Sequence, residues 1–303
     1  MTSSSVSLSP GAALRALLTT TAGAVGIVGG GTPLEARCAV AAGFESFYLS
    51  GYATAAWRHG VPDVGLIAMA EIADAVTAIT AIDQIPVIVD ADTGYGDVAN
   101  VALTVRRLEQ AGAAAVQIED QVWPKRCGHM EGKLVIDASD MVRKVKAAVK
   151  SRADRETMII ARTDSRAPLG VREAIERSNR YLDAGADAIF VDAPHSEEEL
   201  AAIAQAVPGP LVANMSESGK TPILPLDTLG DLGYKIVIYP TSALRLSVGV
   251  ITTLFADLRK NGYSGDWVKQ MITLEQLNAL LGLGELQELE REVAGASATH
   301  PLA

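Results

Sequence analysis

Residues 111–118 read Ala111-Gly112-Ala113-Ala114-Ala115-Val116-Gln117-Ile118, where a helical pattern stops at a glycine and an apolar run begins. A glycine at that place suits the left-handed cap that ends many helices. A continuous apolar run of this length is typical of a strand that is covered on both faces. The same pattern returns at 42–49, 184–191 and 232–239. Each copy is the helix-to-strand half of a β–α unit, so the chain alternates helices with parallel strands.

Four further apolar runs complete the series of strands, at 24–28, 86–90, 157–162 and 210–214. Eight strands that alternate with helical stretches predict an α/β fold of the (β/α)8, TIM-barrel type. An open, doubly wound sheet is the alternative that the same alternation allows.

A single domain is predicted over residues 1–303, because no shift in composition marks a second one. The barrel is expected over about residues 22–262, with residues 244–260 as its eighth helix. Residues 263–293 form a C-terminal helical extension that a closed barrel does not need. Its apolar face is expected to pack on another subunit or on the side of the barrel. Residues 294–303 are mostly small and are expected to form a loose tail.

The composition is that of a globular protein, with 49% hydrophobic and 20% charged residues. A formal net charge of −10 argues against nucleic acid and anionic membranes as partners. The two cysteines, Cys38 and Cys127, do not suggest a disulfide framework, which favours a reducing, cytoplasmic setting. Cys38 lies in a helical pattern and is expected in the core. The first ten residues lack the basic region of a signal peptide, and no apolar run is long enough to span a membrane.

Polar side chains recur where the predicted strands end. In a barrel these ends meet at one mouth, where barrel enzymes hold their active sites. The residues at these ends are Ser50, Gly51 and Tyr52; Asp90 to Gly96; Glu119 and Asp120; Arg162, Thr163 and Asp164; Asp192; and Asn214 to Glu217.

Asp90 and Asp92 are two residues apart at a strand end, so both carboxylates are expected on the same side. Two carboxylates brought together repel each other unless a cation neutralises them. Oxygen ligands with few soft donors favour Mg²⁺ or Mn²⁺, and Glu119 on the next strand could hold a metal-bound water. The competing interpretation is a simple turn in which Asp92 caps the next helix.

Cys127 lies in a glycine-containing loop between Arg126 and His129, with Lys125 close by. Cationic neighbours lower the pKa of a thiol, so this cysteine is a candidate acid or base near neutral pH. Arg162 ends a buried strand, where a guanidinium needs an anionic partner. That partner is either a substrate carboxylate or a structural one, Asp192 or Glu119.

Together these motifs resemble the isocitrate lyase / phosphoenolpyruvate mutase superfamily. The matching motifs occur in the same order as in the family, from about residue 25 to 260. The Cys-Gly-His loop resembles the carbon–carbon lyase branch, of the 2-methylisocitrate lyase, 2,3-dimethylmalate lyase and petal-death type. The matching stretches are Lys125 to His129, Asp90 to Gly96, Ser50-Gly51, Gly60 to Asp63, Glu119 to Gln121, Ala161 to Asp164 and Asn214 to Glu217.

The resemblance implies a Mg²⁺-dependent lyase that cleaves a 2-hydroxy di- or tricarboxylate to a 2-oxo acid and a second carboxylate. It implies a metal held by Asp90 and Asp92, with Glu119 and Asp63 acting through waters. It implies Cys127 as the general acid or base. The other residues with implied catalytic or substrate-binding roles are Lys125, His129, Arg162, Ser50, Gly51, Tyr52, Gly128, Asp192, Asn214 and Ser216. The resemblance also implies a homotetramer, a dimer of dimers that exchanges the C-terminal helix.

Three departures from the family pattern concern the substrate. Gly31 and Thr32 replace a turn that usually carries a large side chain near the mouth, and Asp192 shortens a carboxylate. Trp57 to His59 is bulkier than expected before Gly60. Two alternatives therefore stay open. One is a different enzyme on the same barrel, either an oxaloacetate decarboxylase or a C–P bond hydrolase. The other is a non-catalytic, metabolite-binding homologue.

Overall fold

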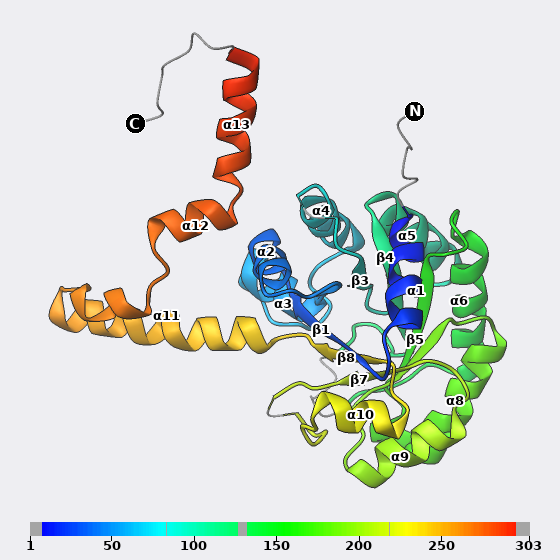
Figure 1. The fold of residues 1–303 in the computed structure, drawn as a ribbon. Coiled ribbons are helices and arrows are strands. Elements are labelled where there is room, and N and C mark those ends of the chain that lie inside the picture. Colours follow the sequence, from blue (N-terminus) through cyan, green and yellow to red (C-terminus); the bar gives the residue numbers. More distant parts are fainter. Residues whose placement is uncertain (1–7, 83, 127–131, 218, 295–303) are drawn as a thin grey trace. The chain divides into compact units, whose positions relative to one another are not determined.

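The computed structural model describes residues 8–82, 84–126, 132–217 and 219–294. Within them, parallel strands close into an eight-stranded barrel in chain order, with β8 paired to β1 (Figure 1). This closure confirms the predicted barrel and excludes the open sheet. The strands are β1 Val25–Gly30, β2 Phe47–Leu49, β3 Val87–Asp90, β4 Ala113–Glu119, β5 Met158–Thr163, β6 Ala188–Val191, β7 Leu211–Asn214 and β8 Ile236–Tyr239.

Helices follow the strands and form the outer layer of the barrel (Figure 1). The helices are α2 Pro33–Ala41, α3 Gly51–Thr54, the π-helical turn η1 Ala55–His59, α4 Met69–Thr80, α5 Val98–Gln110, α6 Ala138–Ser151, α7 Arg166–Leu169, α8 Val171–Asp183, α9 Glu197–Ala206 and α10 Leu226–Leu232. The predicted capping glycines, Gly43, Gly112, Gly185 and Gly233, have φ values between +87° and +105°. They reverse the chain from helix to strand in a conformation that disfavours a β-carbon.

Helix α1, Pro10–Thr20, was not predicted from the sequence. The Ser9 hydroxyl caps its first turn by accepting a hydrogen bond from the Ala12 N–H at 3.3 Å. Leu14 and Leu18 pack with strand residues such as Ile27 and Ile160, which fill the barrel interior. This helix therefore completes the inner core, whereas a larger cluster packs the strands against the outer helices.

The chain divides into two compact units, one ending at Arg245 and the other beginning at Leu246. The division falls inside α11, Ser242–Asn261, whereas the sequence analysis ended the barrel near residue 262 to include this helix. The second unit continues with the 3-10 helix η2 Gly265–Gln270, then α12 Leu274–Leu280 and α13 Leu283–Ala294. Within the ranges described, no helix is both long and apolar enough to cross a membrane.

Candidate active site

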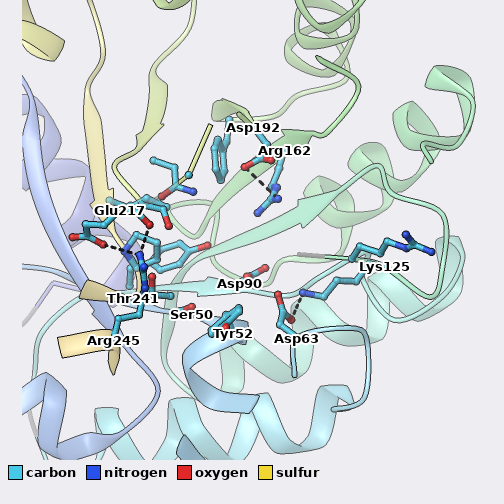
Figure 2. Close-up of a pocket in the computed structure, with 18 residues that line it drawn as sticks. Ser50, Tyr52, Asp63, Asp90, Lys125, Arg162, Asp192, Glu217, Thr241 and Arg245 are labelled. Atoms are coloured by element: carbon cyan, nitrogen blue, oxygen red, sulfur yellow. Dashed lines mark hydrogen bonds and ion pairs between the residues drawn. The ribbon is translucent and has the colours of Figure 1, made fainter. Parts of the chain in front are cut away.

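A cavity of about 360 Å³ lies at the C-terminal ends of the strands, where the sequence analysis placed the site. Figure 2 shows side chains from several strand ends turned into this one space. The cavity is lined by nine of the site residues that were predicted from the sequence: Ser50, Tyr52, Asp63, Asp90, Lys125, Arg162, Asp192, Asn214 and Ser216. Cys127, Gly128 and His129 lie outside the described residues.

The carboxylates of Asp90 and Asp92 both lie beside the backbone of Gly51. A β-carbon placed on Gly51 would lie 3.2 Å from Asp90 Oδ2 and 3.5 Å from Asp92 Oδ1. Strand alternation is only part of the reason, because Asp92 lies beyond β3 and has a φ of +47°. The left-handed turn brings the second carboxylate back over the start of α3. Gly51 leaves the space that both carboxylates occupy.

Lys125 supplies the cation next to this acidic cluster. Its ammonium lies 2.8 Å from Asp92 Oδ1 and also pairs with Asp63. Burial alone would lower the pKa of Lys125, but the charges of Asp92 and Asp63 outweigh it, and the pKa lies well above its usual value. Burial, together with the charges of Asp90 and Asp63, raises the pKa of Asp92 to about 7 against the opposing effect of Lys125. The cluster therefore holds more carboxylates than one lysine can balance.

The acidic cluster has features of a metal site. Among the residues that the structure describes, no three Asp, Glu, His or Cys side chains form a complete metal-binding group. Glu119 Oε1 is buried and has no hydrogen-bond partner in the described part of the chain. Burial also raises the pKa of Glu119 well above its usual value. Mg²⁺ in proteins keeps several waters and uses one or two carboxylates. Asp90 and Asp92 could supply those carboxylates, and the Glu119 oxygen could accept a hydrogen bond from a metal-bound water.

Arg162 is held next to Glu119 by the pairing of β4 with β5, in which the two residues are partners. Its Nε lies 3.3 Å from Glu119 Oε2. Its main partner is Asp164, which accepts hydrogen bonds from Nε at 2.8 Å and from Nη2 at 2.9 Å. The guanidinium carbon also lies 4.9 Å from the centre of the Phe190 ring. Arg162 thus has structural partners, as the competing interpretation required, and it also lines the cavity.

The predicted substrate-binding residues differ in what their polar groups contact. The Ser50 hydroxyl accepts a hydrogen bond from Ala53 N–H, and the Ser50 N–H donates to the Gly30 carbonyl. Tyr52 lies at the cavity wall and is partly exposed. The Asn214 amide oxygen is buried and has no hydrogen-bond partner within the described ranges. Asn214 is therefore the predicted residue whose polar group is most clearly available for a ligand.

Two of the three departures, at Gly31-Thr32 and at Trp57, form one structural cluster around Glu35. This carboxylate accepts hydrogen bonds from Gly31 N–H and the Thr32 hydroxyl, both at 2.9 Å, and from Trp57 Nε1 at 3.1 Å. A β-carbon on Gly31 would meet the backbone of α3 at 2.5 Å. The missing side chain therefore leaves no open space, because the α3 backbone occupies it.

Glu217, named above at the end of a predicted strand, lines the cavity after β7. Thr241 and Arg245 line it after β8 and were not predicted. Thr241 follows the strand end, so the rule that identified the other candidates would have found it, whereas Arg245 lies on α11. Lys133 carries no comparable signal, because the sequence does not show which carboxylates it meets. Cys38 was predicted in the core and is exposed instead.

A model of the phosphoenolpyruvate phosphomutase family matches residues 32–259. The chain is 43% identical to a 2,3-dimethylmalate lyase of Eubacterium barkeri, over 83% of this chain and 87% of that protein. It is 44% identical to a 2-methylisocitrate lyase of Aeropyrum pernix, over 86% and 84%. A crystal structure of 2,3-dimethylmalate lyase superposes with a TM-score of 0.91 and 33% identity, covering 98% of this chain and 99% of that one. A phosphonopyruvate hydrolase solved with oxalate and Mg²⁺ has a TM-score of 0.82 and 30% identity, with 93% and 98% coverage.

Proposed function

This chain belongs to the phosphoenolpyruvate mutase/isocitrate lyase superfamily, and from that premise we propose that it is a Mg²⁺-dependent carbon–carbon lyase. Its substrate is a 2-hydroxy di- or tricarboxylate of the substituted malate or 2-methylisocitrate type. The products are a 2-oxo acid, such as pyruvate, and a second carboxylate. One observation carries the proposal: Asp90 and Arg162 line the same cavity, so a metal-binding end and a carboxylate-binding side face one substrate-sized space.

The metal would be held by Asp90 and Asp92, with Glu119 and Asp63 behind waters. The excess of buried carboxylates and the unpaired Glu119 oxygen support this choice. When bound, Mg²⁺ supplies Lewis acidity that lowers the pKa of the substrate 2-hydroxyl. Mn²⁺ has the same ligand preference and is the alternative ion.

Other residues of the chain bind the substrate and stabilise the acidic cluster. Arg162 binds a substrate carboxylate, helped by Asn214, Ser216 and His129. Ser50, Gly51, Tyr52 and Gly128 surround the oxo-acid end, with Asp192 behind Arg162. Lys125 keeps the acidic cluster charged and in place.

The reaction breaks the C2–C3 bond. The 2-hydroxyl gives up its proton to water, the electron pair of the C2–C3 bond stays on C3, and the C2 oxygen becomes the carbonyl of the 2-oxo acid. The Cys127 thiol then gives its proton to C3 and is left as a thiolate, which regains a proton from water, so that one proton moves in total from the hydroxyl to C3. In the reverse direction the thiolate removes that proton.

The proposal is tested by measuring the release of pyruvate or glyoxylate. A coupled assay that oxidises NADH monitors this release. The substrates are 2,3-dimethylmalate, 2-methylisocitrate, isocitrate and simple alkylmalates, each with Mg²⁺. Release that disappears with chelator and with Cys127→Ser would support the lyase, and the best substrate would name the branch. No release, with oxaloacetate or phosphonopyruvate consumed instead, would favour the decarboxylase or the C–P hydrolase. Binding of oxalate without any turnover would favour the metabolite-binding homologue. The predicted homotetramer and cytoplasmic location remain predictions.

A further inference from the structure

Lys133 is buried among the carboxylates that hold Arg162. Its ammonium lies 2.9 Å from Asp164 Oδ1 and 2.8 Å from Asp192 Oδ2, and only 1% of its side chain is exposed. Arg162 contacts the same two carboxylates, through Nη2 at 2.9 Å from Asp164 Oδ1 and 3.4 Å from Asp192 Oδ1. Two cations and two carboxylates therefore form a closed ring of ion pairs.

The net charge of this ring affects how well the cavity can bind an anion. Lys133 and Arg162 are the cations that contact Asp164 and Asp192, and Arg162 Nε also lies 3.3 Å from Glu119 Oε2. Arg162 lines the cavity. Without the Lys133 ammonium, the same buried carboxylates would face one cation fewer. The group would then carry one more unit of negative charge beside the place where an anion binds. In a buried site such a charge acts strongly, because water screens it poorly.

We propose that Lys133 is a positioning residue, which balances Asp164 and Asp192 so that Arg162 can bind a substrate carboxylate. This inference rests on the proposed function, in which Arg162 is the carboxylate-binding residue. Lys133 itself does not line the cavity but contacts Asp164 and Asp192, the two carboxylates that also hold Arg162.

The backbone around Lys133 is held by other groups. Val122 N–H donates to the Leu134 carbonyl at 2.8 Å, and Ile136 N–H donates to the Asp120 carbonyl at 2.9 Å. Asp164 is fixed separately, since its N–H donates to Asp120 Oδ1 at 2.9 Å. Substituting the Lys133 side chain therefore removes a charge while these contacts remain.

Isothermal titration with oxalate, in the presence of Mg²⁺, tests the role of Lys133. Lys133→Met should weaken oxalate binding roughly tenfold or more, because an unbalanced buried carboxylate repels the anion. Binding of the monoanion pyruvate should weaken less than that of the dianion oxalate. The KM for the lyase substrate should rise by more than kcat falls. Lys133→Arg, which keeps the charge, should restore oxalate binding to within about threefold of wild type.

Lys235→Met is the matched control. Lys235 donates to the carbonyls of Thr21 and Gly23, both at 2.7 Å, and does not line the cavity. Its loss should lower thermal stability and leave oxalate binding unchanged. If Lys133→Met does not fold, Lys133→Gln takes its place, because it keeps a hydrogen-bond donor and removes the charge.

The outcomes separate the two proposals. Wild-type protein that neither binds oxalate nor releases a 2-oxo acid would overturn the proposed function and this inference with it. Wild-type protein that does both, with Lys133→Met and Lys133→Gln binding oxalate equally well, would overturn only the role of Lys133. An equal loss of oxalate and pyruvate binding in Lys133→Met would also overturn it, since repulsion depends on ligand charge.

Discussion

The Lys125 ammonium lies 2.8 Å from Asp92 Oδ1, and both side chains are buried. Asp92 follows β3, whereas Lys125 belongs to the stretch after β4 that leads to Cys127. This ion pair therefore joins the proposed metal ligands to the segment that carries the proposed general acid. Gln121 supports the same segment, since its side chain accepts a hydrogen bond from Arg126 N–H at 3.0 Å and donates to the Arg126 carbonyl at 2.8 Å.

Asp92→Asn should weaken Mg²⁺ binding roughly 10- to 100-fold, because it removes one of the two proposed carboxylate ligands. The Mg²⁺ concentration that gives half-maximal lyase activity measures this loss. Asp97→Asn is the matched control, since Asp97 lies on the same loop and is exposed. Equal Mg²⁺ dependence in wild type and Asp92→Asn would remove Asp92 from the metal site.

Cys127→Ser should lower kcat for lyase turnover by a factor of roughly 10² to 10⁴, the range that a general acid contributes. The hydroxyl is a much weaker acid than the thiol, so proton delivery to C3 slows. Oxalate binding should persist in this variant, which separates chemistry from binding. Cys38→Ser should behave like wild type, because Cys38 lies on α2 and is exposed. Unchanged turnover in Cys127→Ser would assign proton transfer to another group.

Glu199→Gln should reduce stability at pH 7 by about 1 kcal/mol, because Glu199 forms a two-bond ion pair with Arg166, at 2.8 Å and 2.5 Å. The Arg166 guanidinium lowers the pKa of Glu199 in the folded protein. A carboxylate with a lowered pKa stabilises the fold above its unfolded pKa, and this contribution disappears as pH falls through the folded pKa.

Urea unfolding of wild type and Glu199→Gln, from pH 7 down to the most acidic pH at which both fold, measures this effect. The difference in unfolding free energy should shrink as pH falls below the usual range of glutamate. A difference that does not change with pH would show that packing, rather than ionisation, makes the Glu199 contribution.

Leu14→Ala should lower the free energy of unfolding by roughly 2–5 kcal/mol, because Leu14 is fully buried in the barrel interior. Leu17→Ala on the same helix should cost less, since Leu17 is only partly buried. Chemical denaturation of both variants checks the comparison. Equal losses would mean that α1 does not contribute to the inner core as described.

Local sequence signals were enough to predict the barrel and most of the candidate site. Helix-ending glycines such as Gly112 and Gly185, followed by apolar runs, depend on neighbours within a few residues. The convergence of Asp90, Arg162 and Asn214 then follows from the geometry of a parallel barrel, whose strand ends meet at one mouth.

Helix α1 escaped prediction because its role is non-local. Its sequence holds only a modest helical pattern, and its leucines matter because they meet strand side chains inside the barrel. The packing of α3 against Gly31 is of the same kind, because it brings together segments whose contact the sequence does not encode locally.

The sequence by itself thus determined the order of the eight strands and of the helices between them, the family and most of the polar residues at the mouth, because caps, periodicity and motifs are local properties of the chain. Only the tertiary structure decided how the buried charges pair: Lys125 with Asp63 and Asp92, and Lys133 with Asp164 and Asp192. Each buried cation pairs with the carboxylates that the folded barrel places beside it, because an unpaired charge is costly away from water.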